Sequence, residues 1–233
     1  MSATKKILFF LIISVSLMLS GFAFVEDNLP FTGEDPGLAI AYDGLPLAQP
    51  ISFDTLQDVG NAELQVSKTI PVNDFVQSLF DGNANTIRGL YVNNKFAFPV
   101  VQQPSGNAGF VATTEDVITD FAMPRKYGVT GLLAHNYLAG DEFFGLEIGD
   151  LIQVVYGDGT VLMYQVSDIQ SYQALSPNSP SSNFVDLATS EKLTANELFK
   201  RVYMGEHHLT LQTCIQQGSE DSWGRLFVIA DPV

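Results

Sequence analysis

The chain has 233 residues, of which 46% are hydrophobic, so it can bury one good core but has little room for two full domains. Its formal net charge is -15, from 26 acidic and 11 basic side chains. Such a charge argues against nucleic acid and anionic lipid headgroups as partners, because both would be repelled. It suits a solvated extracellular surface.

Residues 1–24 have the pattern of an export segment. Two lysines precede an uncharged apolar run at 7–19, and small residues at 20–23 have a spacing that suits a signal peptidase. The apolar stretch is also close to the length of about 20 residues that a membrane span needs. The segment is therefore predicted to be either a cleaved signal peptide or a membrane anchor. Both alternatives place residues 25–233 outside the cytoplasm.

Residues 25–90 are acidic and are interrupted by Pro and Gly, which predicts a partly ordered leader with one short helix near 73–80. The β-rich remainder, 91–233, is the predicted folded domain. Within the leader lies a pentapeptide whose Pro and Gly favour a turn, Leu29-Pro30-Phe31-Thr32-Gly33.

The folded domain begins with short elements. An apolar run at 96–101 predicts its first strand, and a capped segment at 117–121 predicts a short helix. Residues 129–134 predict a strand that ends at His135. A histidine in this position is most often a surface residue or part of a turn. A function for His135 is therefore inferred only from the other residues that accompany it in the sequence.

A hairpin and a helix are predicted next. Apolar runs at 151–156 and 160–169 are joined by Gly157-Asp158-Gly159, residues that accept positive φ, and this pattern predicts a β-hairpin. Residues 194–197 form a capping box that begins a helix reaching Tyr203.

The only cysteine of the chain, Cys214, ends a strand-like segment. Apolar and polar residues alternate over 209–213, which predicts a strand with the thiol at its C-terminal end. Residues 215–224 predict a loop, and 225–230 predict another strand with Arg225 at its first position. A lone thiol in an exported protein is an inert buried side chain, an intermolecular partner or a nucleophile.

Two further histidines, His207 and His208, come shortly before this strand. Adjacent side chains on a strand point to opposite faces, so at most one of them can reach a given site. A zinc site that combines them with Cys214 lacks a recognisable ligand spacing and a fourth ligand. No metal or organic cofactor is expected.

Together these segments resemble the sortases, the cysteine transpeptidases of bacterial cell surfaces. The resemblance covers the C-terminal half to two-thirds of the chain. It rests on segments in the family order, namely Gly131-Leu132-Leu133-Ala134-His135-Asn136, Phe143-Phe144-Gly145-Leu146, Gly149-Asp150-Leu151-Ile152, Thr210-Leu211-Gln212-Thr213-Cys214 and Arg225. It implies a mainly β fold, a sortase-like closed β-barrel with a few short helices.

The resemblance also implies a catalytic set of His135, Cys214 and Arg225. Cys214 would form an acyl-thioester with a peptide that carries an LPxTG-like sorting signal, and Arg225 would stabilise the oxyanion. His135 would act as general acid and then as general base, and we expect a nearby cation to favour the thiolate. Asn136 and Thr213 would orient the site. The implied acceptor is an amine, such as a cell-wall peptide or a pilin lysine.

The leader pentapeptide Leu29-Pro30-Phe31-Thr32-Gly33 matches the Leu-Pro-x-Thr-Gly signal that many sortases cleave between Thr and Gly. It lies far from the C-terminus, so it is not an ordinary sorting signal. Two interpretations remain, an ordinary turn and a tethered pseudosubstrate or self-cleavage site that contacts the enzyme's own groove.

Two other functions fit parts of the sequence. One is a non-catalytic secreted β-barrel that serves as a binding module, with Cys214 as a small buried residue. The other is an exported cysteine transpeptidase that acts on peptidoglycan cross-links. The segment around the nucleophile of that family resembles Ser-His-Gly-Cys, whereas this chain has Leu211-Gln212-Thr213-Cys214.

Overall fold

The computed structural model describes residues 70–233. The expected export segment, 1–24, and the leader pentapeptide, 29–33, lie outside the described residues. Across residues 70–233, no helix is both long enough and apolar enough to cross a membrane.

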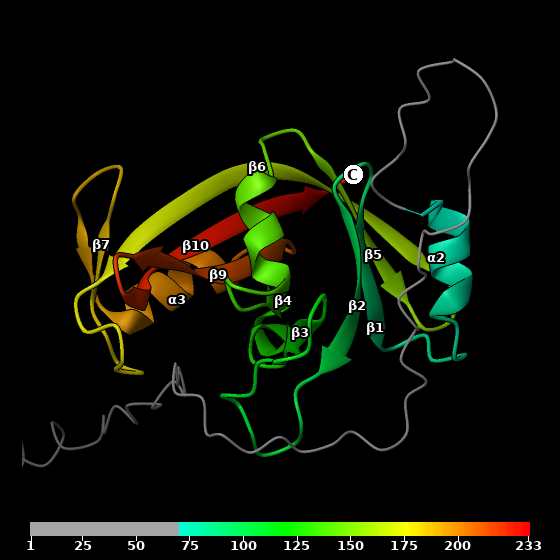
Figure 1. The fold of residues 1–233 in the computed structure, drawn as a ribbon, viewed down its shortest axis with the longest axis horizontal. Helices are drawn as coiled ribbons and strands as arrows, with labels where there is room; N and C mark the ends of the chain where they lie inside the picture. The colour runs from blue at the N-terminus through cyan, green and yellow to red at the C-terminus, as the bar shows by residue number, and fades with distance from the viewer. Residues whose placement is uncertain (1–69) are drawn as a thin grey trace, which may run out of the picture.

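The described chain is a closed β-barrel with short helices around it (Figure 1). The strands are β1 (Ile87–Val92), β2 (Phe96–Gln102), β3 (Ile118–Phe121), β4 (Thr130–Leu133), β5 (Leu151–Tyr156), β6 (Val161–Ala174), β7 (Phe184–Asp186), β8 (Lys192–Leu193), β9 (Leu209–Gln217) and β10 (Glu220–Pro232). The α-helices are α2 (Val72–Ser78) and α3 (Ala195–Tyr203), and the 3-10 helices are η1 (Pro124–Tyr127) and η2 (Ala139–Gly145). The prediction of a mainly β barrel with a few short helices is confirmed.

The barrel closes through one long strand. The strand order is β10-β9-β4-β3-β2-β1-β5-β6, and β6 pairs with β10 to complete the ring. The pairs β2–β3 and β4–β9 are parallel, and the other pairs are antiparallel. Strands β7 and β8 extend the sheet from β6 outside the ring. Closure gives the barrel strands a partner on both sides, which leaves few open edges.

Alternation along each strand directs apolar side chains both into the barrel and to clusters outside it. One core fills the barrel and includes Leu211, Leu226 and Val228. A second core lies outside the barrel wall, where α3 packs against β4, β9 and β10, and it includes Leu133 and Phe227. In Figure 1, α3 lies along β9 and β10, and α2 lies at the other end of the barrel near β5.

Helix α3 forms as its sequence predicts. Thr194 Oγ1 accepts a hydrogen bond from the Glu197 backbone N–H at 3.2 Å, and the Glu197 carboxylate accepts one from the Thr194 N–H at 2.8 Å. These bonds complete the predicted capping box, which satisfies two N–H groups at the helix start. Leu198, Phe199 and Val202 are buried on one face, so α3 is anchored to the barrel.

Three predicted elements differ from the structure. The segment predicted as the first strand, 96–101, is β2, because another strand, β1, precedes it from Ile87. The segment predicted as a helix at 117–121 contains strand β3, because pairing with β2 and β4 satisfies its backbone and all four of its residues are buried. The loop predicted at 215–224 is mostly strand, since β9 and β10 meet in a tight turn with Gly218 at φ 63°.

Candidate active site

Cys214 and Arg225 are cross-strand neighbours. They lie directly opposite each other in the antiparallel pairing of β9 and β10, and paired residues share one face of a sheet. Leu211 and Leu226 point into the barrel core, so alternation places Cys214 and Arg225 on the outer face. Phe227, two residues after Arg225, lies in the outer core under α3 and marks the same face.

His135 follows the strand on the other side of β9. Leu133 of β4 pairs with Gln212 in parallel register, and the Ala134 N–H extends this pairing with a 3.1 Å hydrogen bond to the Gln212 carbonyl. Continued to residue 135, the register brings His135 level with Cys214. Leu133 belongs to the outer core, so alternation puts His135 on the same outer face. Thus Cys214 and Arg225 come from the paired strands β9 and β10, and His135 follows β4, the strand on the other side of β9.

The 3-10 helix η2 fixes the backbone at His135. The N–H groups of Leu138 and Gly140 both donate to the His135 carbonyl at 3.0 Å. Gly140 allows η2 to lie close to β9, because a Cβ there would collide with Thr213 Oγ1 and with the carbonyls of Ala134 and His135. Thr213 was expected to orient the site, and the structure has it buried against this glycine.

Asn136 links the histidine segment to β10. Its Nδ2 donates to the Asp221 carbonyl at 3.1 Å. The Arg225 guanidinium donates through Nη1 to the carbonyls of Ser222 at 2.8 Å and Gly224 at 2.7 Å. The register between β9 and β10 slips within this same stretch, from Glu220 to Gly224. The bulge at 221–223 therefore connects the side chain of Asn136, the residue after His135, with the Arg225 guanidinium. Sequence analysis did not predict this link.

Tyr137 is a further aromatic residue at the site. Its ring stacks on that of His135, with a centroid distance of 5.1 Å and an interplanar angle of 21°. Tyr137 is 60% exposed, whereas His135 is half-buried. The tyrosine therefore covers one face of the imidazole from the solvent side. An exposed tyrosine two residues after a histidine gives no clear signal in a single sequence.

The electrostatics of the thiol correct one expectation. Burial is the largest effect on the half-buried Cys214 and raises its pKa, and the carboxylates of Asp221 and Glu220 raise it further. Arg225 lowers the pKa, as expected of a nearby cation, but the net shift is upward. The thiol is therefore mainly protonated at neutral pH, and nucleophilic attack requires a base.

His207 and His208 have other partners. The His207 ring lies 2.7 Å from the Gly128 carbonyl and 2.9 Å from the Tyr164 hydroxyl. The His208 ring lies between the carbonyls of Glu206, at 2.7 Å, and Val202, at 3.1 Å. In the part of the chain from residue 70 onward, no three His, Cys, Asp or Glu side chains are grouped in a way that could hold a metal ion.

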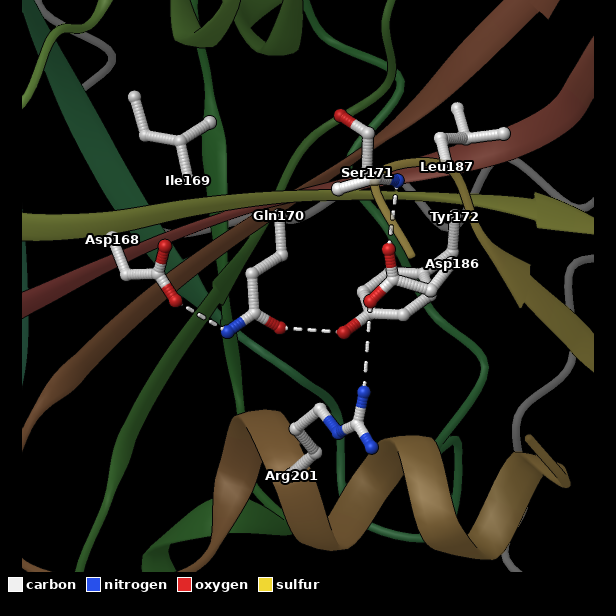
Figure 2. Close-up of a pocket in the computed structure, with 9 residues that line it drawn as sticks. Asp168, Ile169, Gln170, Ser171, Tyr172, Asp186, Leu187 and Arg201 are labelled. Carbon is white, nitrogen blue, oxygen red and sulfur yellow. Dashed lines mark hydrogen bonds and ion pairs between the residues drawn. The ribbon is translucent and has the colours of Figure 1, made fainter. Parts of the chain in front are cut away.

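A cleft of about 520 Å³ lies between β6, β7 and α3 (Figure 2). One of the residues that line the cleft, Tyr172 of β6, is paired with Arg225 of β10. The cleft therefore begins on the strand next to that of the arginine. The remaining lining residues are Asp168, Ile169, Gln170, Ser171, Asp186, Leu187, Ala188 and Arg201. Sequence analysis did not predict this cleft, because its groups come from three separate elements.

The polar groups of the cleft bind one another. Figure 2 shows Asp168, Gln170 and Tyr172 directed toward α3, with Gln170 joined to the other two by hydrogen bonds of 2.6 Å. Arg201 rises from α3 and lies 3.6 Å from the Asp186 carboxylate. Because these polar groups already bind one another, the cleft is a weaker candidate for the reacting site than the surface around Cys214.

No protein-family model matches the chain, and no curated protein matches it. Among solved structures, sortase C-1 from Actinomyces oris is 16% identical with a TM-score of 0.42, over 72% of this chain and 83% of that one. A Clostridium perfringens sortase D5 transpeptidase is 15% identical with a TM-score of 0.41, over 70% and 89%. Sortase C1 from Streptococcus agalactiae is 18% identical with a TM-score of 0.39, over 65% and 68%.

Proposed function

We propose that this protein is a sortase-like cysteine transpeptidase that acts outside the cytoplasm. Its substrates are surface proteins or peptides with an LPxTG-like signal, and its acceptor is an amine. The single observation that carries the proposal is the cross-strand pairing of Cys214 with Arg225 on the outer face of the barrel. A guanidinium held next to a nucleophile can donate to the oxyanion that forms when the nucleophile attacks a peptide carbonyl.

The first half-reaction starts from a protonated thiol. Because the pKa of Cys214 is raised, we assign His135 to remove the thiol proton as the sulfur attacks the scissile carbonyl carbon. The carbonyl oxygen becomes an oxyanion, and the Arg225 guanidinium donates charge-assisted hydrogen bonds to it. His135 then returns the proton to the leaving amine as the carbon–nitrogen bond breaks. The product is an acyl-thioester on Cys214.

The second half-reaction releases the acyl group. An incoming amine attacks the thioester while His135 takes its proton, and the carbon–sulfur bond breaks to restore the thiol. An amine acceptor gives transpeptidation, whereas water gives hydrolysis. The chemistry uses only side chains of this chain.

Arg225 is suited to this role by how it is held. It is 1% exposed, and its Nη1 donates to two backbone carbonyls of its own strand, which fixes the plane of the guanidinium. A planar fork that is held at one nitrogen presents its other side in a defined direction. Little reorganisation is then needed when the oxyanion forms.

One observation favours the alternative of a non-catalytic binding module. Burial of Cys214 raises its pKa, which is also the property of an inert core cysteine. A methanethiosulfonate reagent separates the two functions. A nucleophile at the surface of the barrel wall reacts in the folded protein and reacts more slowly after His135→Ala. An inert core thiol reacts only after denaturation.

The direct test of the proposal is a mass-spectrometric screen of Leu-Pro-x-Thr-Gly-like peptides with assorted amines. We expect cleavage between Thr and Gly and a new amide between the threonine carbonyl and the amine. Cys214→Ala should abolish both products. Identical product yields for the wild type and Cys214→Ala would overturn the proposal, as would the absence of any product across the screen.

A further inference from the structure

The 3-10 helix η2, which supports His135, is unusually long for its type. It has seven residues, whereas 3-10 runs beyond three or four residues are uncommon because their hydrogen bonds have poorer geometry. Its first turn contains Asp141 and Glu142, and its last turn contains no basic side chain. A cation from another element would therefore stabilise the C-terminal end of η2.

Lys95 supplies this cation from the turn between β1 and β2. Its Nζ donates to the carbonyl of Gly145, the last residue of η2, at 2.6 Å and lies 2.7 Å from Asp150 Oδ2. The same carboxylate oxygen accepts a hydrogen bond from the Glu147 N–H at 2.7 Å. Lys95 and Asp150 together form a clamp around the C-terminal end of η2, which we call the Lys95–Asp150 clamp.

The residue after Lys95 holds η2 from the core side. The Phe96 ring packs against the ring of Phe143 in η2, with a centroid distance of 6.1 Å, and both rings are buried in the barrel. The clamp itself lies nearer the surface, since Lys95 and Asp150 are 29% and 23% exposed. Partly exposed ion pairs contribute little to global stability, so variants of the clamp should still fold.

The opposite end of η2 holds the backbone of His135. The N–H groups of Leu138 and Gly140 donate to the His135 carbonyl at 3.0 Å, and Gly140 lies against Thr213. One short helix therefore connects the clamp to the histidine, so a shift at one end displaces the other. A displacement of about 1 Å at a reacting group can lower a rate about 100-fold.

We propose that Lys95 and Asp150 are positioning residues that hold His135 in place through η2. The inference rests on the proposed transpeptidase function, in which His135 transfers protons at the thiol. The clamp acts through the backbone of His135 and takes no part in the proton transfer. Its loss therefore lowers kcat, which depends on the position of the imidazole, and leaves KM nearly unchanged.

The first test is turnover of a Leu-Pro-x-Thr-Gly peptide with an amine. Lys95→Met and Asp150→Asn should each lower kcat about tenfold and change KM less than about twofold. Lys95→Arg should restore most of the activity, because a guanidinium can also donate to a carbonyl and a carboxylate together. Arg88→Met is the matched control, since it breaks a partly exposed ion pair with Asp81 that does not involve η2. Wild-type kcat in both clamp variants, or an equal loss in Arg88→Met, would overturn the proposal.

The two clamp variants also separate positioning from a long-range effect of charge. Lys95→Met removes a positive charge and Asp150→Asn removes a negative charge, so their effects on the electric field at the thiol have opposite signs. Loss of the clamp instead lowers kcat in both variants. Changes of kcat in opposite directions would overturn the positioning role.

A double-mutant cycle tests whether the effect passes through His135, with a readout that needs no turnover. The reaction of Cys214 with a methanethiosulfonate reagent at neutral pH should slow about tenfold after Lys95→Met. It should slow no further when Lys95→Met is added to His135→Ala, because the group that the clamp positions is then absent. Equal slowing in both backgrounds would overturn the proposal.

Hydrogen exchange separates this inference from the proposed reaction. The Leu138 and Gly140 amides, which bind the His135 carbonyl, should exchange faster in Lys95→Met than in the wild type. Faster exchange and slower thiol reaction, without peptide turnover by the wild type, would overturn only the transpeptidase. Turnover with unchanged exchange would overturn only the clamp. A thiol whose reaction rate is the same after His135→Ala would overturn both.

Discussion

Arg225 lies directly opposite Cys214 across β9 and β10, with the guanidinium 1% exposed and bonded to the carbonyls of Ser222 and Gly224. A buried cation needs strong partners, and here two backbone carbonyls supply them. The position of Arg225 is therefore set by the barrel itself. The proposed role of Arg225 follows from this fixed position next to the thiol.

Replacement of Arg225 by lysine should lower kcat about 100-fold, the scale found for the loss of one oxyanion donor. Lysine keeps the charge but lacks the planar fork that reaches two carbonyls and an oxyanion together. Single-turnover measurement of acylation checks this. Arg201→Lys, on α3, is the matched control and should leave kcat unchanged. An Arg225→Lys variant that acylates at the wild-type rate would exclude the oxyanion role.

Asp221→Asn should make Cys214 more reactive at a given pH. The Asp221 carboxylate raises the thiol pKa, so its removal lowers that pKa and increases the thiolate fraction. In the wild type the pKa is raised, so alkylation should accelerate as the pH rises above neutral. The Asp221 carbonyl that binds Asn136 is retained in the variant. Alkylation rates from pH 6 to 10 check this, with Asp168→Asn as control, and an unchanged or slower rate for Asp221→Asn would contradict it.

Gly140→Val should displace η2 and with it the backbone of His135. The new side chain would collide with Thr213 Oγ1 and with the His135 carbonyl, and overpacking of this kind typically costs about 1–3 kcal/mol of folding free energy. Chemical denaturation and kcat/KM should both report a loss. Gly145→Ala, at the other end of η2, has no atom within 4 Å of its new Cβ and serves as control. Equal behaviour of the two variants would argue against η2 as the support of His135.

Local patterns carried much of what sequence analysis predicted correctly. The capping box before α3, the hairpin of β5 and β6, the strand before His135 and the strand that contains Cys214 are encoded within a few neighbouring residues. Alternation predicted the strand that carries Cys214, but β9 continues to Gln217, so the thiol lies within the strand and not at its end. The closed barrel followed from the family resemblance.

Long-range pairing decided what was missed. Residues 118–121 are buried on both faces between β2 and β4, so the helical cap signal before them was overridden. The bulge at 221–223 depends on the register with β9, and the bond between Tyr203 and Gln212 depends on the docking of α3. The raised pKa of Cys214 likewise comes from burial, which a sequence pattern does not report.

The pentapeptide at 29–33 gives a prediction that needs no structure of the leader. If the enzyme uses it as a tethered substrate, intact mass of the purified chain should show loss of the segment before Gly33. A double change, Leu29→Ala with Thr32→Ala, should prevent the loss and alter the activity toward added peptide. A wild-type chain that keeps this segment, together with unchanged activity of the double variant, would leave an ordinary turn as the interpretation.

The central claim is that Cys214 carries the acyl group of a cleaved peptide. Intact-mass spectrometry of the full chain after brief incubation with a Leu-Pro-x-Thr-Gly peptide, without an amine acceptor, measures this directly. We predict an adduct with the mass of the Leu-Pro-x-Thr acyl group that hydroxylamine removes and that is absent from Cys214→Ala. An adduct that persists in Cys214→Ala, or cleavage of the peptide with no adduct in a rapid-quench time course, would contradict the account.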